Sequence, residues 1–262
     1  MGVEQVGAAA RVHRTGGDAG PALVLVHGLG ATSRSFDRLR AALPATRAVL
    51  TVDLPNGAPV DDEAAALAAE LARFEVRGAT VVGHSRGGLV AVALARGAPA
   101  LVGRLVLIDS PPSTGARLTA RGLQESALGV PVLGRLLWAA ASRSALRRGL
   151  RSAVAPGIAV PEVLVEDLAH TPHQAFVGAS RTLDRFLEQA PLRERLGALA
   201  REHPVPVLVV VGTSDQRVDP ATLLALADVD GVTVERLPGI GHSPAWETPR
   251  VVAELLTAGD GR

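Results

Sequence analysis

The sequence predicts an α/β protein with a mostly parallel central sheet, helices on both faces and an inserted helical cap. Short apolar, β-branched runs alternate with longer helical patterns, which is typical of βαβ units. This alternation stops between about residues 111 and 189, where the pattern stays helical and Pro and Gly interrupt it. A chain of 262 residues suits one large domain. We therefore expect a core of residues 1–110 and 190–262, with a cap of residues 111–189.

The expected strands are nearly all apolar, as in strands that helices cover on both faces. They are residues 22–26, 48–52, 80–82, 105–108, 207–211 and 232–236. The expected helices of the core are residues 35–43, 61–74, 87–96, 220–227 and 249–256. The second of these opens on acidic residues and the last two carry a Pro near their first turn, and both features favour a helix N-terminus.

The composition narrows the chemistry that the chain can perform. The chain has no Cys and no Tyr, and all 27 of its Lys and Arg residues are Arg. Disulfides, thiolate nucleophiles and Schiff-base lysines are therefore excluded. The net charge of +1 gives no reason to expect nucleic acid as a partner. Neither a signal peptide nor a membrane span is evident, so we expect a cytoplasmic protein.

Ser85 is the candidate nucleophile. Residues 83–87 read Gly-His-Ser-Arg-Gly, between an apolar strand and a predicted helix. A G-x-S-x-G turn in this setting holds a serine hydroxyl at a helix N-terminus, where N–H groups favour developing negative charge. The alternative is a structural serine that happens to be flanked by glycines.

The sequence resembles the α/β-hydrolase family over nearly its whole length. The resemblance rests on His-Gly-Leu-Gly at 27–30, Asp-Leu-Pro at 53–55, Gly-His-Ser-Arg-Gly-Gly at 83–88, Gly-Thr-Ser-Asp at 212–215 and Gly-Ile-Gly-His-Ser-Pro at 239–244. It implies a catalytic triad of Ser85, Asp215 and His242. It also implies an oxyanion hole formed by the backbone N–H groups of Leu29 and Arg86.

Two of these assignments have rivals. Asp109 follows the strand at 105–108, where some relatives carry the triad carboxylate, although Asp215 has the more usual position. Asp109 could instead cap a loop through nearby N–H groups.

The other histidines are expected to shape loops or to be solvated, and His170 and His173 could also line the pocket. No spacing typical of a zinc site appears, so we expect no metal and no cofactor.

The cap is expected to carry the features that select the substrate. Trp138 and Phe176 are the large candidates for the pocket wall. Residues 117–151 hold seven arginines against one acid, Glu125: Arg117, Arg121, Arg135, Arg143, Arg147, Arg148 and Arg151. One interpretation is a solvated basic face above inward-packed apolar residues: Leu133, Leu136, Leu137, Trp138 and Leu146. The other is a docking patch for an acidic partner, such as an acyl carrier protein.

The leading hypothesis is hydrolysis of a small-molecule carboxylic ester, lactone or thioester through an acyl-enzyme on Ser85. A C–C bond hydrolase or a perhydrolase would use the same triad. From a different class, the fold could serve as a ligand-binding receptor without catalysis. Dehalogenase and epoxide hydrolase chemistry are disfavoured, because such relatives carry Asp where this chain has Ser85 and the cap has no Tyr.

Overall fold

The chain is represented by a computed structural model that describes residues 10–118 and 127–258, built around one seven-stranded sheet. The strand order is β1-β3-β2-β4-β5-β6-β7. Only β1 runs antiparallel to its neighbour, so the sheet is mostly parallel, as predicted. The strands are β1 Arg11–Thr15, β2 Leu23–Val26, β3 Val49–Asp53, β4 Ala79–His84, β5 Val102–Ile108, β6 Val207–Gly212 and β7 Val232–Leu237.

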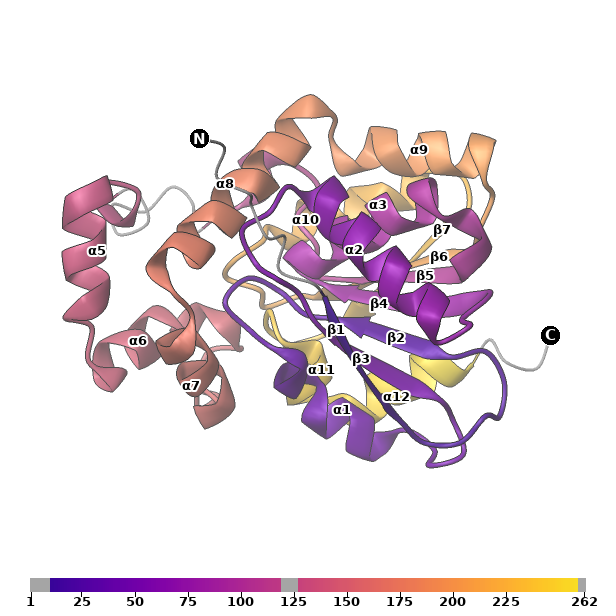
Figure 1. Ribbon diagram of the computed structural model, residues 1–262, viewed down its shortest axis with the longest axis horizontal. Helices are drawn as coiled ribbons and strands as arrows, with labels where there is room; N and C mark the ends of the chain where they lie inside the picture. Colours follow the sequence, from indigo (N-terminus) through magenta and orange to yellow (C-terminus); the bar gives the residue numbers. More distant parts are fainter. Residues whose placement is uncertain (1–9, 119–126, 259–262) are drawn as a thin grey trace.

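Helices cover both faces of the sheet (Figure 1). One face packs against α2 (Val60–Arg73), α3 (Arg86–Gly97), α9 (Leu192–Glu202) and α10 (Pro220–Leu224). The other packs against α1 (Asp37–Ala42), α11 (Pro244–Glu247) and α12 (Pro249–Thr257). Alternate residues of a strand point to opposite faces, so the apolar strands fill two separate core layers.

The six expected strands and five expected core helices are present, with ends that differ by up to three residues. Two helices begin or end in a tighter 3-10 turn, at Ser33–Phe36 before α1 and at Ala225–Asp228 after α10. The sequence did not lead us to expect β1. Its residues, Arg-Val-His-Arg-Thr, are mostly exposed because β1 is an edge strand that, among the described strands, pairs with β3 alone. Their polar pattern gives no strand signal.

The inserted region is helical, as predicted, and lies beside the sheet (Figure 1). It contains α5 (Pro131–Ala139), α6 (Arg143–Gly149), α7 (Glu162–His170) and α8 (His173–Gln189). Its own apolar cluster includes Leu150 and Leu164. The end of α8 packs into the main core through Leu183 and Phe186, so this helix joins the cap to the sheet. The limits 111 and 189 for the cap stay predictions.

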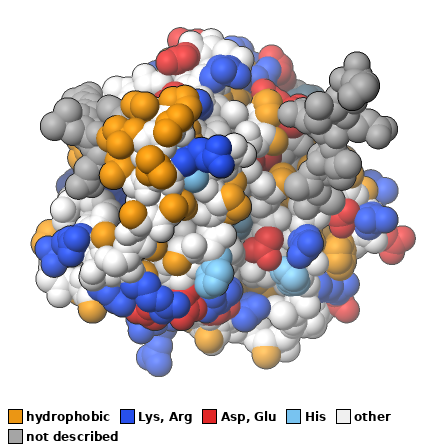
Figure 2. Space-filling view, turned by 60° about the vertical axis from the view of Figure 1, so that its left-hand side comes forward, with side chains coloured by type: hydrophobic (Ala, Val, Ile, Leu, Met, Phe, Trp, Pro, Cys, Tyr) orange, Lys and Arg blue, Asp and Glu red, His pale blue; other side chains and the backbone are white. Residues whose placement is uncertain are grey.

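On the outer face of α5, leucines that were expected to pack inward are exposed. Leu133, Leu136 and Leu137, expected to pack inward, are 47%, 64% and 45% exposed, and Val132 is 72% exposed. Figure 2 shows apolar side chains gathered on this side of the molecule, next to arginine. The inner face of this short helix has room for only part of its apolar residues, and Trp138 occupies it. Within the described residues, no helix is both long and apolar enough to cross a lipid bilayer.

Candidate active site

The parallel strands end at one edge of the sheet, and the loops that follow β2, β4, β6 and β7 meet there around a small cavity. This edge is where ligands bind in open α/β sheets. The cavity has a volume of about 80 Å³, and Ser85, His242 and Leu29 are among the residues that line it. Three of the sequence-predicted site residues, from different parts of the chain, therefore share one cavity.

Ser85 stands in the sharp turn between β4 and α3. Its φ is 51° and its ψ is −121°, a strained combination for a residue with a side chain. The turn is possible because a Cβ at Gly83 would lie 2.4 Å from the Gly88 Cα, and one at Gly87 would lie 2.3 Å from the Val26 carbonyl oxygen. The Ser85 hydroxyl makes no hydrogen bond with any residue that the structure describes, so it is free to approach a ligand in the cavity.

Asp215 and His242 are brought together, as the sequence predicts. His242 Nδ1 lies 2.7 Å from Asp215 Oδ2, and both side chains are buried. The other carboxylate oxygen of Asp215 accepts the N–H groups of Arg217 and Val218, at 2.7 and 3.1 Å. A carboxylate accepts only, so the proton of a neutral His242 is on Nδ1 and its Nε2 is left with a lone pair. A general base needs this tautomer.

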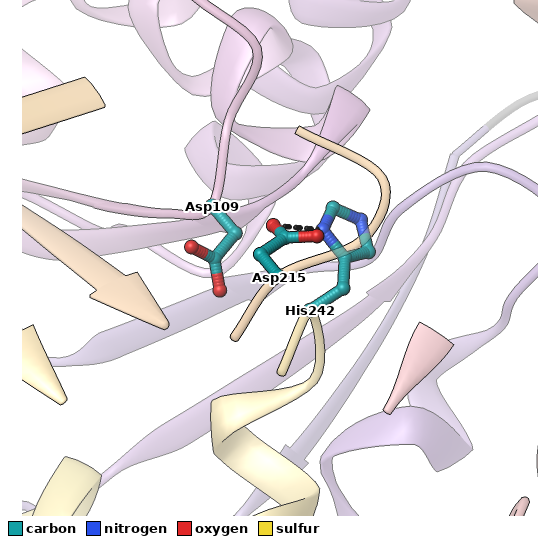
Figure 3. A group of neighbouring side chains, drawn as sticks. All are labelled: Asp109, Asp215 and His242. Atoms are coloured by element: carbon teal, nitrogen blue, oxygen red, sulfur yellow. Dashed lines mark hydrogen bonds and ion pairs between the residues drawn. The ribbon is translucent and has the colours of Figure 1, made fainter. Parts of the chain in front are cut away.

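Asp109 lies on the other side of Asp215 from His242 (Figure 3). One of its oxygens accepts the Gly212 N–H at 2.9 Å, which agrees with a loop-capping role, and the other has no partner among the described residues. Burial, and then the charge of Asp215, raises the pKa of Asp109 well above its usual range. The raised pKa favours the protonated, neutral form of Asp109, and Asp109 makes no hydrogen bond to His242.

The three residues could also be considered as metal ligands, since their potential ligand atoms lie within 4.8 Å of one another. The hydrogen bonds argue against it. Both Asp215 oxygens and His242 Nδ1 are already used in bonds to one another and to backbone N–H groups. The donor set therefore fits the orientation of an imidazole better than the binding of a cation.

The predicted oxyanion donors have N–H groups available. Within the described residues, the Leu29 N–H has no hydrogen-bond partner. Arg86 is the first residue of α3, so its N–H has no acceptor within the helix. The Arg86 side chain turns away from the cavity and is buried. It forms an ion pair with Glu63 of α2 and donates to the carbonyl of Ala179 in α8, at 3.1 Å.

A family model described as the alpha/beta hydrolase family matches residues 23–255 of the chain. The chain belongs to the alpha/beta hydrolase family. It is 35% identical over 214 residues to a pimeloyl-[acyl-carrier protein] methyl ester esterase of Neisseria meningitidis, an alignment that covers 76% of this chain and 77% of that protein.

Solved structures of other hydrolases have a similar fold. An esterase from Exiguobacterium antarcticum superimposes with a TM-score of 0.76 and 17% identity, over 95% of this chain and 94% of that one. A meta-cleavage product hydrolase from Pseudomonas fluorescens gives a TM-score of 0.72 and 18% identity, over 95% of this chain and 94% of that one. At this identity the likeness concerns the fold alone.

The wall of the cavity differs from the expectation for this alpha/beta hydrolase. Neither Trp138 nor Phe176 lines it, and the large ring there belongs to Trp246. The rings of Trp138 and Phe176 pack against each other at 4.8 Å inside the cap. The indole N–H of Trp138 donates to the Thr171 carbonyl at 3.0 Å, which turns the ring into the cap. His170 and His173 do not line the cavity either.

Arg117 does not belong to the exposed group of arginines that the sequence suggested. Its side chain is buried, forms an ion pair with Asp184 and bonds Ser180 at 3.2 Å, so it is not available at the surface. Two further arginines, Arg143 and Arg147, share Glu162. Arg121 and Glu125 lie outside the described residues. Of these seven arginines, those that are exposed without an ion pair to any described residue are Arg135, Arg148 and Arg151.

Three polar side chains of the site have partners that the sequence did not indicate, although His84 was expected to shape a loop. His84 donates from Nε2 to the His242 carbonyl at 2.6 Å. Glu247 accepts the N–H groups of Gly241 and Ser243, at 3.1 and 3.2 Å, and thereby holds the loop that carries His242. Arg86 was expected to act only through its backbone. All three lie within or next to family motifs, but a motif does not tell where a side chain points.

Proposed function

We propose that the protein is a serine hydrolase that cleaves a carboxylic ester, lactone or thioester through an acyl-enzyme. His242 takes the proton of the Ser85 hydroxyl as its oxygen attacks the substrate carbonyl carbon. The tetrahedral intermediate then collapses, the bond to the leaving group breaks, and His242 gives the proton to that group. Water, activated by the same imidazole, attacks the acyl-enzyme and releases the acid and the serine.

The observation that carries this proposal is the shared cavity of Ser85 and His242, with Asp215 bonded to the far side of the imidazole. A serine hydroxyl is a weak nucleophile without a base, and the base needs an oriented tautomer. The N–H groups of Leu29 and Arg86 support the proposal further as donors to the oxyanion. One such donor is typically worth about a hundredfold to a thousandfold in turnover.

Labelling with a fluorophosphonate probe tests the nucleophile. Wild type should be labelled, and Ser85→Ala should not, because the probe reacts with an activated serine hydroxyl. Ser144→Ala is the control, since Ser144 lies on α6 and does not line the cavity, and its label should stay at the wild-type level. No labelling of wild type, or equal labelling of Ser85→Ala, would reject the serine-hydrolase proposal and favour a ligand-binding receptor.

A panel of p-nitrophenyl esters, lactones, acyl thioesters and a vinylogous diketone separates the substrate classes. We expect turnover of the esters or of their thioester and lactone analogues. Turnover confined to the diketone would replace the proposal by C–C bond hydrolysis with the same residues.

The exposed surface of α5, α6 and the 3-10 turn Arg151–Ala153 is proposed to receive an acidic carrier protein that presents the acyl group. Arg135, Arg148 and Arg151 supply positive charge, and the exposed Leu133 and Leu136 supply apolar contact area. The Neisseria relative is named for an ester of an acyl carrier protein, which supports this choice of partner.

Charge-neutral variants test the carrier proposal. Replacing Arg135, Arg148 and Arg151 together by Gln should raise KM for a carrier-bound ester at least tenfold and leave KM for the free ester unchanged. A second triple variant removes the same charge from exposed positions outside the cap: Arg96, Arg201 and Arg250. Equal effects of the two variants, or equal effects on both substrates, would reject carrier docking at this surface.

A further inference from the structure

His84 lies between the proposed nucleophile and the proposed base. It is the last residue of β4, directly before Ser85, and its ring lines the cavity. Its Nε2 donates to the backbone carbonyl of His242 at 2.6 Å, and the two imidazole rings are 5.0 Å apart. One side chain thus connects the turn that carries the nucleophile to the loop that carries the base.

The direction of this hydrogen bond determines the protonation of His84. A carbonyl oxygen can only accept, so the proton must be on Nε2. Burial, and then the charge of a protonated His242, lowers the pKa of His84 to about 3. The ring is therefore neutral at ordinary pH, with an unprotonated Nδ1. A Cβ built at Gly28 would lie 3.2 Å from this Nδ1 and 3.1 Å from the Ser85 Cβ, so a larger residue at position 28 would crowd the ring.

His242 is held from several directions. Asp215 bonds its ring, and Glu247 accepts the N–H groups of Gly241 and Ser243 on either side of it. These bonds orient the imidazole and the two neighbouring peptide groups. The carbonyl of His242 is different, because among the described residues His84 alone donates to it. Since His242 is buried, water cannot readily replace that donor.

We propose that His84 is a positioning residue, which fixes the backbone of His242 so that its imidazole keeps the correct distance from the Ser85 hydroxyl. This inference rests on the proposed triad. Catalytic geometry is sensitive to small displacements, and a shift of about 1 Å can cost about a hundredfold in rate. Loss of the His84 donor should therefore lower kcat far more than it changes KM, because the lost hydrogen bond holds the base, whereas the ring is only one of the groups that line the cavity.

The variants His84→Gln and His84→Leu test this role. Gln carries an N–H donor with a reach similar to that of imidazole Nε2, whereas Leu fills comparable space without a donor. We expect His84→Leu to lower kcat by about a hundredfold. His84→Gln should recover most of this loss at an unchanged melting temperature. His203→Leu, which removes a histidine outside the site, serves as the control and should match wild type.

The pH profile distinguishes positioning from base catalysis. The charged groups that face His84 are Asp215, Arg217 and protonated His242. Since His84 stays neutral, the acid limb of kcat/KM reports the base. This limb should be the same in wild type and His84→Gln. If the limb disappears with His84, then His84 is itself the base and the positioning role is wrong. Equal kcat for His84→Leu and wild type would also overturn the inference.

A spectroscopic measurement keeps the inference separate from the proposed function. Long-range 15N–1H spectra at neutral pH should show His84 as a neutral imidazole with its proton on Nε2. A charged ring, or a proton on Nδ1, would contradict the hydrogen bond whether or not the protein hydrolyses esters. A wild type that shows this tautomer but neither reacts with fluorophosphonate nor turns over any ester would reject the proposed function and, with it, the role of His84 in catalysis.

Discussion

Two carboxyl groups lie side by side at the ends of β5 and β6, and only one of them faces the imidazole. Asp215 bonds His242, whereas Asp109 bonds the Gly212 N–H. We expect Asp215→Asn to lower kcat by about 10⁴-fold, because an amide stabilises the wrong tautomer of the base. Asp109→Asn should stay within about tenfold of wild type, since a neutral carboxyl and an amide are similar in shape and charge. Steady-state rates on one ester compare the two, and a larger loss in Asp109→Asn would make Asp109 the triad acid.

Asp109 also gives the folding stability a predicted dependence on pH. Its pKa is raised in the folded protein, and in the unfolded chain it is about 3.9. Above about pH 4 the folded state therefore binds more protons than the unfolded state, so stability falls as pH rises toward the folded pKa. Asp109→Asn removes this proton, and Asn tolerates the positive φ of 45° at this position.

Thermal unfolding of wild type and Asp109→Asn across pH checks this sign. The melting temperature of the variant relative to wild type should increase from about pH 4 upward. Parallel melting curves of the two proteins against pH would show that Asp109 has an ordinary pKa.

Among the helices, the connection between α2, α3 and α8 is the feature with the largest expected effect on stability. The fully buried Arg86 and Glu63 form an ion pair there. Removing one partner of a buried pair leaves an uncompensated charge, which typically costs about 3–5 kcal/mol. We therefore expect Glu63→Gln to lower the free energy of unfolding in urea by about that amount.

The same helix provides a matched control. Glu70 of α2 pairs with Arg73, whose side chain is 75% exposed. Exposed pairs are worth about 1 kcal/mol or less, so Glu70→Gln should unfold nearly as wild type does. Equal losses in the two variants would mean that the Arg86–Glu63 pair contributes no more than a surface pair.

The elements also show which features of the fold and the site could be predicted from the sequence. The fold and the elbow at Ser85 could be predicted because their signals are local: an apolar strand, two glycines without room for a Cβ, and a following helix. The direction of the Arg86 side chain could not, because its partners Glu63 and Ala179 lie 23 and 93 residues away in the chain. The same holds for Trp138, whose position depends on Thr171.

In the whole molecule, the cap and the core together set the size of the cavity at Ser85. A volume of about 80 Å³ is well below the roughly 300–1,000 Å³ of ordinary small-molecule sites. Three leucines of the cap line this cavity: Leu150, Leu164 and Leu183, the last of them on α8. A cavity of this volume suits a short acyl group, and a longer one requires more space between the cap and the core.

The acyl-chain preference of the wild type and of two cap variants tests whether the volume of the cavity limits the length of the acyl group. Wild type should hydrolyse p-nitrophenyl acetate and butyrate with higher kcat/KM than the octanoate. Leu164→Ala removes part of the cavity wall and should shift the preference toward longer chains. Leu168→Ala makes the same change in volume on the same helix at a residue that does not line the cavity, so the preference should stay as in wild type. If wild type prefers the octanoate, the cap opens readily and the closed cavity does not select the substrate. If both variants shift the preference equally, the cause is loosening of the cap rather than the wall at Leu164.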